Sequence, residues 1–394
     1  MTGAAVVGVG MTRFGKHLDT SLSELARIAV FTALADAQAN IDDVDMVFVA
    51  NAMASLTTGQ VSVVGQSVLR PLGFSDIPVF NIDNACAASS SALNLAVQAV
   101  AAGAARTVLV LGVEKLYAHE KGIAYRALNG AMDTDTLRAS GVDPARESGF
   151  VSAIYPERFR RYRDRWGLDV TALAEIAVKN RFHAALNPLA QYTAPLSVDD
   201  VLAARTVVDP LTTLMCAPIG DGAAALVVTG ADDARAHGRR PVWIRGSAIG
   251  MGATPNGTSS VARVARRAYD QAGITPDEVD VAEVHDSISF NELAAYEELG
   301  LCEEGQGGRM ALDGETRLGG RVPVNTSGGL TSRGHPVAAT GAAQIVELVH
   351  QLRHDAADRQ VADACIGVAE NAGGFALDDT AAIAITVLGT EPAR

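Results

Sequence analysis

Ile41-Asp-Asp-Val-Asp-Met-Val-Phe-Val-Ala50 closes a unit that the chain repeats later as Pro276-Asp-Glu-Val-Asp-Val-Ala-Glu-Val-His285. In both copies a polar turn leads into an apolar strand, and a helical stretch precedes the turn, at 24–34 and at 264–269. An apolar strand that contains glycine comes before each helix. This agreement in element order, helix spacing and strand position predicts that one α/β unit has been duplicated.

Each copy then continues with a strand, a turn, a helix of small residues and further strands. The predicted elements are strands at 78–80 and 107–111 and a helix that ends at Ala102 in the first half, then a strand at 322–325, a helix at 338–352 and strands near 366–368 and 381–388 in the second. Strands that alternate with helices predict mixed or parallel sheets that are covered by helices on both faces.

The repeat predicts an N-terminal half at 1–235 and a C-terminal half at 236–394. Between Lys115 and Thr206, the first half carries a polar insertion of about residues 116–206 that also contains aromatic residues. An insertion of this size is expected to cover an active site, like a lid. Its basic run, Arg158-Phe-Arg-Arg-Tyr-Arg163, is interpreted as a solvated helix face.

The composition indicates a soluble, intracellular globular protein. The 394 residues are 48% hydrophobic, which is enough to bury one large core or two similar ones. A net charge of −13 argues against nucleic-acid binding, which normally leaves a basic surface. Cys86, Cys216, Cys302 and Cys365 form no Cys-x-x-Cys pair, which favours a reducing cytosol over a zinc ribbon or a disulfide framework. Since no segment is long and uncharged enough to span a membrane, we expect a cytoplasmic protein.

Cys86 is the first candidate for chemistry. It lies in Asn84-Ala-Cys-Ala-Ala-Ser-Ser-Ser91, where a predicted strand gives way to a helix. A thiol at a helix N-terminus faces unpaired N–H groups and the positive end of the helix dipole, and both favour the thiolate. An isolated cysteine is more often a core residue, however. The interpretation as a nucleophile therefore depends on its partners.

Two histidines of the second half are the candidate partners. His285 ends the repeated strand, and His335 lies in a Gly-rich loop that leads into a helix. Both occur at the end of the unit where Cys86 stands in the first half. Two related halves packed about a pseudo-twofold axis would bring the three side chains together, where an imidazole could deprotonate the thiol and donate a hydrogen bond to an acyl oxyanion.

These motifs resemble those of the thiolase superfamily over nearly the whole chain. Asn84-Ala-Cys-Ala-Ala-Ser89 is similar to its nucleophile motif, and Ser327-Gly-Gly-Leu-Thr-Ser-Arg-Gly-His-Pro336 is similar to its Gly-His-Pro motif. His285-Asp-Ser-Ile-Ser-Phe290 looks like the His-Asp-x-Phe element of sterol-carrier-protein-type and archaeal thiolases. The resemblance implies an α/β thiolase fold of five layers, αβαβα, commonly as a homodimer.

The resemblance also implies roles for these residues. Cys86 would accept an acyl group from a CoA thioester, His335 would activate it, and His285 would bind the thioester oxygen of the second substrate. A further oxyanion site would use the backbone N–H groups of Cys86 and Gly373. CoA enters as substrate and no permanently bound cofactor or metal is implied. Relatives of the sterol-carrier type make a small partner protein with a zinc ribbon and an OB-fold plausible.

One departure concerns the second cysteine that many thiolases use to move a proton. Cys365-Ile-Gly367 matches the Cys-x-Gly pattern literally, but Asn371-Ala-Gly-Gly374 resembles the Asn-x-Gly-Gly turn that replaces it in sterol-carrier-type relatives. We favour the second alignment, in which Asn371 occupies the catalytic position and Cys365 is structural. Ser287 and Asn325 are further supporting candidates, although a serine hydroxyl needs an activating partner.

Three functions remain open at this point. The first is a thiolase that makes or cleaves a β-ketoacyl-CoA. The second is an acyltransferase of the same fold that passes the acyl group to another acceptor, such as an aromatic carbon. The third is a non-catalytic acyl-CoA-binding scaffold. Retention of Cys86, His285 and His335 argues against the scaffold, and also against a retro-aldolase, a function of relatives that lack the nucleophile.

Overall fold

The computed structural model describes residues 3–143, 148–149, 151, 154–253, 259–376 and 379–393. Residues 1–2 of the expected first strand and residues 144–147, 150 and 152–153 of the expected insertion lie outside the described residues.

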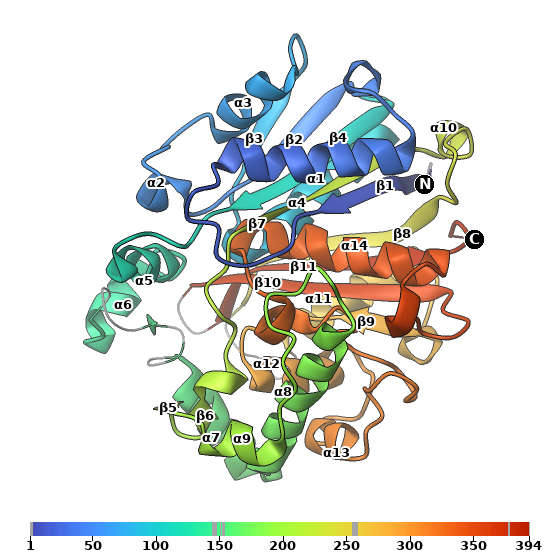
Figure 1. Ribbon diagram of the computed structural model, residues 1–394. Coiled ribbons are helices and arrows are strands. Elements are labelled where there is room, and N and C mark those ends of the chain that lie inside the picture. The colour runs from blue at the N-terminus through green and yellow to red at the C-terminus, as the bar shows by residue number, and fades with distance from the viewer. Residues whose placement is uncertain are drawn as a thin grey trace.

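One continuous sheet of nine described strands has a part in each half, and these two parts, with helices outside and between them, form five layers (Figure 1). The described strands join in the order β3-β2-β4-β7-β1-β8-β11-β10-β9, and the halves meet where β1 pairs with β8 over three residue pairs. Helices α4 and α14 lie against strands of both halves and therefore form the middle layer, while α1 and α11 cover the outer faces. The predicted αβαβα arrangement of two related halves is confirmed.

The first half contains β1 (Ala4–Met11), α1 (Leu22–Ala37), β2 (Met46–Ala50), α2 (Ala54–Thr57), α3 (Val64–Leu69), β3 (Val79–Ile82), α4 (Ala88–Ala101), β4 (Thr107–Glu114), β7 (Gly222–Gly230) and α10 (Ala231–Ala234). The second half contains β8 (Val242–Gly250), α11 (Ser260–Ala272), β9 (Val281–Glu283), α12 (Ser289–Glu298), α13 (Gly307–Leu312), α14 (Thr340–Arg353), β10 (Ile366–Ala376) and β11 (Asp379–Gly389). Strand directions also repeat, because β2 runs parallel to β4 as β9 does to β10, and β7 and β11 are antiparallel to both of their neighbours.

Glycines let the outer helices approach the sheets in the same way in both halves. A Cβ on Gly8 of β1 would lie 2.3 Å from the carbonyl oxygen of Ala33 in α1, and a Cβ on Gly246 of β8 would lie 2.3 Å from that of Ala268 in α11. Since real side chains cannot approach so closely, glycine at both positions permits the same helix packing. Close packing of a helix on the sheet thus explains why both strands of the repeat contain glycine.

The second half differs from the prediction at residues 322–325. Only Val324 bridges β9, although the Ala282 N–H donates to the Pro323 carbonyl (3.1 Å) and the Asn325 N–H donates to the Ala282 carbonyl (2.8 Å). Because Pro323 has no N–H, a regular ladder cannot extend through it. The counterpart of β3 is therefore a short edge contact.

The segment between β4 and β7 adds α5 (Lys121–Asn129), α6 (Thr134–Ser140), α7 (Tyr155–Trp166), α8 (Val170–Ala185), α9 (Val198–Ala203), β5 (Thr206–Val208) and β6 (Leu211–Thr212). Helices α7, α8 and α9 gather beside the second half, where α8 packs on α12 and α13 (Figure 1). In the described part of the chain, no helix combines the length and the apolar character needed to cross a membrane.

Candidate active site

Cys86 lies in a short 3₁₀ turn, Ala85–Ala87, immediately before α4. The turn is tight: Ala85 has φ of 48°, and its N–H donates to the Asp83 carboxylate (2.9 Å). Strand β10 presses on the turn from the second half, since a Cβ on Gly373 would lie 2.2 Å from the Asn84 carbonyl oxygen. The sulfur is thus held where the halves meet.

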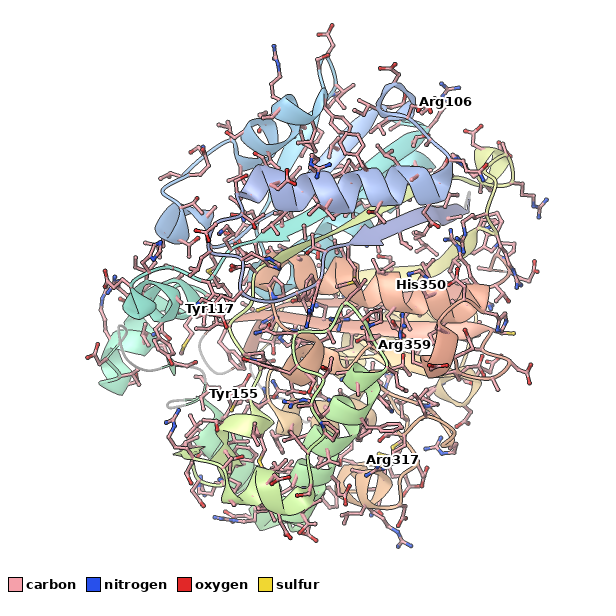
Figure 2. The ribbon with its side chains drawn as sticks, viewed as in Figure 1. Arg106, Tyr117, Tyr155, Arg317, His350 and Arg359 are labelled. Atoms are coloured by element: carbon pink, nitrogen blue, oxygen red, sulfur yellow. The ribbon has the colours of Figure 1, made fainter. Side chains whose placement is uncertain are left out.

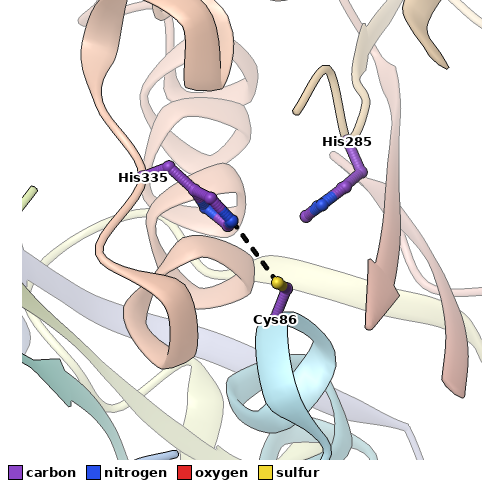
Figure 3. Close-up of side chains that lie close together, drawn as sticks. All are labelled: Cys86, His285 and His335. Atoms are coloured by element: carbon purple, nitrogen blue, oxygen red, sulfur yellow. Dashed lines mark hydrogen bonds between the residues drawn. The ribbon is translucent and has the colours of Figure 1, made fainter. Parts of the chain in front are cut away.

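His335 lies directly beside the thiol of Cys86. Its Nε2 is 3.4 Å from the Cys86 sulfur (Figure 3), and its Nδ1 is 2.7 Å from the Thr340 hydroxyl. That hydroxyl donates its one proton to the Pro336 carbonyl at 3.3 Å, so it accepts from a protonated Nδ1. This tautomer leaves a lone pair on Nε2 that faces the thiol.

Small residues of α4 and α14 allow this approach. The Ala342 N–H donates to the Ser89 hydroxyl (2.9 Å), and a Cβ on Gly341 would lie 2.0 Å from the Ser90 hydroxyl oxygen. The two helix starts therefore touch almost backbone to backbone, with the turn of Cys86 at one and the loop of His335 at the other. Larger residues here would separate the sulfur from the imidazole.

His285 completes the cluster from the end of β9. Its backbone N–H donates to the Glu370 carboxyl (2.7 Å), and its ring lies edge-on to that of His335 with centroids 5.2 Å apart. Its Nδ1 has no hydrogen-bond partner among the described residues. The candidate ligand atoms of Cys86, His285 and His335 lie within 4.8 Å of one another, so these residues could also hold a metal ion such as zinc.

Buried charged side chains fix the segments that carry His285 and His335. Asp286 accepts the N–H groups of Leu330 (2.6 Å) and Thr331 (3.2 Å), and Arg333 pairs with Glu283 at 3.1 Å. A second buried pair joins Lys179 of α8 to Glu292 of α12. These contacts fix the loop that carries His335 to the strand that carries His285.

Burial keeps all three reactive side chains neutral. It raises the pKa of Cys86 to about 12, although the N–H groups of Gly374 and of Cys86 itself lie near the sulfur and lower it. Burial lowers the pKa of His285 to about 3 and that of His335 well below its usual value, with Arg333 adding to both. The thiolate expected from the helix end is thus disfavoured in the unliganded site, because desolvation outweighs the N–H groups.

The cluster opens into a cavity of about 1210 Å³. Tyr117 and Tyr155, labelled in Figure 2, line it from the segment between β4 and β7. The exposed cations Lys16 and Arg205 also line it, which places them at its mouth. Cys216 is a second thiol on its wall, which the sequence did not distinguish from the other cysteines.

Ser287 belongs to a hydrogen-bond network with Tyr155 and Asn291 at the cavity. Its hydroxyl lies 3.1 Å from that of Tyr155, and the Asn291 side-chain amide donates to both hydroxyl oxygens at 2.9 Å. Both Ser287 and Tyr155 line the cavity. Tyr155 comes from α7, far away in the sequence, so no local motif could have indicated it.

The other expected site residues lie around the cavity or away from it. Gly374 lines the cavity with its N–H near the sulfur, whereas Gly373 packs on the Cys86 turn. Asn371 is buried and donates to Gln344 of α14 at 2.9 Å, away from the cavity. Cys365 is exposed just before β10 begins, at the strand end opposite Gly374.

Asn325 acts on the site indirectly. Its side-chain oxygen accepts the Val284 N–H (2.8 Å), directly before His285, and its amide donates to Glu292 (2.9 Å). It thus ties the end of β9 to α12 without lining the cavity.

Two family models match the chain. The thiolase N-terminal domain matches residues 4–232, and the thiolase C-terminal domain-like family matches residues 242–386.

Individual proteins show the same similarity. The chain is 36% identical over 384 residues to an acetyl-CoA acetyltransferase of Methanothermobacter thermautotrophicus, an alignment that covers 95% of this chain and 97% of the relative. It is 35% identical to sterol carrier protein 2 of Bos taurus, over 93% of this chain and 69% of that protein. The fold is similar to that of the Ltp2-ChsH2(DUF35) aldolase, with a TM-score of 0.80, 27% identity and 98% of each chain covered.

Proposed function

This chain belongs to the thiolase family, and we propose that it transfers acyl groups from acyl-CoA through a thioester on Cys86. The observation that carries the proposal is the contact of 3.4 Å between the Cys86 sulfur and Nε2 of His335 at the wall of a large cavity. A neutral thiol beside a neutral imidazole suits a nucleophile that loses its proton as it attacks.

The first half-reaction follows from this geometry. The Cys86 sulfur attacks the thioester carbonyl carbon while its proton moves to Nε2 of His335. The tetrahedral intermediate then expels the sulfur of CoA, which takes the proton back from His335, so that free CoA leaves and Cys86 is acylated. The N–H groups of Cys86 and Gly374 supply the oxyanion site, in place of the pair with Gly373. Lys16 and Arg205 at the mouth suit the phosphates of CoA.

For the second half-reaction we propose Claisen condensation or its reverse, thiolytic cleavage of a β-ketoacyl-CoA. His285 would bind the thioester oxygen of the second substrate, since its ring faces the same space as His335. The carbanion that attacks the Cys86 thioester must first lose a proton to a nearby base. His285 and His335 are the imidazoles in reach of this space.

A second candidate acceptor is a molecule other than CoA, such as an aromatic carbon. The observation that favours it is the position of Cys365, which is exposed and does not line the cavity, while Asn371 points toward α14. These positions support a second half-reaction in which Cys365 carries no proton. The similar fold of an aldolase points to a third chemistry, but the Cys86–His335 pair supports acyl transfer.

The partner protein and the homodimer expected from the sequence are also proposals. In the aldolase of similar fold, Ltp2 is paired with ChsH2(DUF35). We propose that this chain also takes a small zinc-ribbon and OB-fold partner, and that it forms a homodimer in the cytoplasm. Co-purification from the native host, with mass measurement of the complex, tests both.

Intact-mass spectrometry after mixing with a panel of acyl-CoAs tests the nucleophile. We expect one acyl adduct on the wild-type protein and none on Cys86→Ala. An adduct that survives in Cys86→Ala would refute the assignment. Thiolysis of acetoacetyl-CoA separates the acceptors, because an adduct without thiolysis favours the non-CoA acceptor. Cys365→Ala should leave both steps largely intact, and a loss of several orders of magnitude without unfolding would make Cys365 the proton carrier.

A further inference from the structure

One arginine of the basic helix α7 faces the cavity instead of solvent. Arg160, Arg161, Arg163 and Arg165 are exposed and each lies within 4 Å of a carboxylate at the surface. Arg158 is half-buried, lines the cavity, and places its guanidinium carbon 5.7 Å from the ring centroid of Phe375. The interpretation of the whole run as a solvated face is therefore wrong for Arg158. The turn of the helix separates it from its neighbours.

Arg158 has no hydrogen bond or ion pair to the protein among the described residues. Its contact with the ring of Phe375 satisfies none of its N–H donors. A cation at the wall of a partly apolar cavity is normally paired, because leaving it without a counter-ion is costly. The negative charge that pairs with Arg158 would therefore come from a substrate bound in the cavity.

The acidic residues on the same wall do not fill this role. Glu298 and Glu370 line the cavity, but Glu298 is bonded to the Ser259 hydroxyl (2.6 Å) and Glu370 to the His285 N–H. Burial raises the pKa of both, that of Glu370 to about 8, even though Arg158 lowers each of them. Neither carboxyl forms an ion pair with Arg158 among the described residues, so Arg158 is an unpaired cation on this wall.

The position of Arg158 separates it from the cations that suit CoA. Lys16 and Arg205 are exposed at the mouth, whereas Arg158 lies over the ring of Phe375, which also contacts the ring of Tyr155 at 6.2 Å between centroids. Phe375 directly follows Gly374, whose N–H lies near the Cys86 sulfur. Arg158 therefore lies on the side of the reacting acyl group.

We propose that the acyl group carried by Cys86 ends in a carboxylate and that Arg158 binds it. The inference rests on the proposed function. A guanidinium offers two parallel N–H donors to a carboxylate, which gives both charge and direction. The preferred substrates are then CoA thioesters of dicarboxylic acids or the corresponding β-keto compounds. An overall charge of −13 would not attract such substrates, but an unpaired cation on the cavity wall does so locally.

The test compares glutaryl-CoA with pentanoyl-CoA, which has the same acyl length without the charge. We expect Cys86 to be acylated about 10- to 100-fold faster by glutaryl-CoA, the range of a hydrogen-bonded charge pair. Arg158→Met should remove this preference and leave the pentanoyl rate within about twofold. The matched control is Arg163→Met, on the same helix but at the surface, which should change neither rate.

The outcomes separate the two proposals. Equal rates for both probes in the wild type, or equal losses for both probes in Arg158→Met, overturn the carboxylate site while acylation of Cys86 stands. No adduct with either probe overturns the proposed function instead. In that case calorimetry of the same two CoA esters with Cys86→Ala still decides the binding site, since only the glutaryl ester should lose affinity when Arg158→Met is added.

Discussion

The two halves share strand order, strand direction and glycine-mediated helix packing, yet they hold their reactive loops by different means. In the first half, Glu114 at the end of β4 accepts the N–H groups of Ala52 and Met53, which belong to the hydrophobic cluster beside Cys86, at 3.1 Å. It also accepts the N–H of Ala338, which follows His335 in the second half, at 3.3 Å. In the second, the loop before His335 is fixed by the buried Arg333–Glu283 pair. The two halves thus share a backbone arrangement but differ at their reactive residues. One half carries the neutral thiol of Cys86, and the other carries two histidines whose loop is fixed by a buried ion pair.

This difference teaches how symmetry can serve an asymmetric reaction. The nucleophile needs a small, rigid turn that leaves its sulfur accessible, and the tight turn of Cys86 provides that. The imidazole of His335 needs a fixed ring orientation and tautomer, which its buried hydrogen bond to the Thr340 hydroxyl provides. Each half therefore keeps the common scaffold and changes only the supports of its loop.

The largest expected effect separates the two histidines. His335→Gln should slow acylation of Cys86 about 10²- to 10⁴-fold, because it removes the base that takes the thiol proton. His285→Gln should keep acylation within about tenfold and slow the second half-reaction by about 10²-fold or more. Quenched single-turnover mass measurements follow each step, and equal losses of acylation in both variants would contradict the division of roles.

The second prediction compares the loop supports. Arg333→Met should lower the free energy of unfolding by about 3–5 kcal/mol, because it leaves Glu283 buried without its cation. Glu114→Gln should cost about 1–3 kcal/mol, since the amide nitrogen cannot accept the backbone N–H groups. The exposed ion pair of Arg309 with Asp313 provides the control, because Arg309→Met should lower the free energy of unfolding by only about 0–1 kcal/mol. Denaturant unfolding measures all three, and the reverse order would refute the comparison.

The shared scaffold was predictable from the sequence because it has a local signature. The repeat of helix, turn and strand, with glycines in the preceding strands, predicted two related halves. The repeat also predicted the meeting of Cys86, His285 and His335, because all three stand at the same end of the repeated unit. What the sequence could not show was the protonation of Cys86, since desolvation depends on the walls that other segments contribute.

The remaining differences depend on contacts between distant segments. The sequence could not show that the side chain of Arg158 faces the cavity, because arginines occur on several sides of α7. The approach of the Gly374 N–H to the Cys86 sulfur depends on the backbone of β10, where Gly374 has φ of 64°. Tyr155 reaches Ser287 only because α7 packs beside the second half.

The third prediction concerns acid stability and His183, which joins α8 to the second half. His183 of α8 has Nδ1 3.0 Å from the Asn325 carbonyl, and its Nε2 accepts the Leu318 N–H at 3.1 Å. It is therefore neutral, and burial lowers its pKa to about 3. Below about pH 6.5 the unfolded chain binds a proton that the folded chain does not, so stability falls with pH down to about pH 3.

The slope from this group is at most about 1.4 kcal/mol per pH unit. His183→Gln should be less stable than the wild type at pH 7, and the gap should narrow by about 1 kcal/mol at pH 5.5. Buried carboxyls with a raised pKa, such as Glu370, act in the opposite direction but equally in both proteins. Guanidinium unfolding at the two pH values measures the gap, and a constant gap would show that His183 does not titrate on unfolding.

The smallest expected effect probes Ser287 and Tyr155. The Asn291 amide donates to both hydroxyl oxygens, and one hydroxyl donates to the other, so one proton of the two is left for the cavity. Ser287→Ala or Tyr155→Phe should slow the second half-reaction about 2- to 10-fold, the range of one neutral hydrogen bond, and leave acylation of Cys86 unchanged. The double variant should cost little more than either single one, because both hydroxyls belong to one network. A loss above about 100-fold for Ser287→Ala alone would instead make its hydroxyl the proton carrier of the second half-reaction.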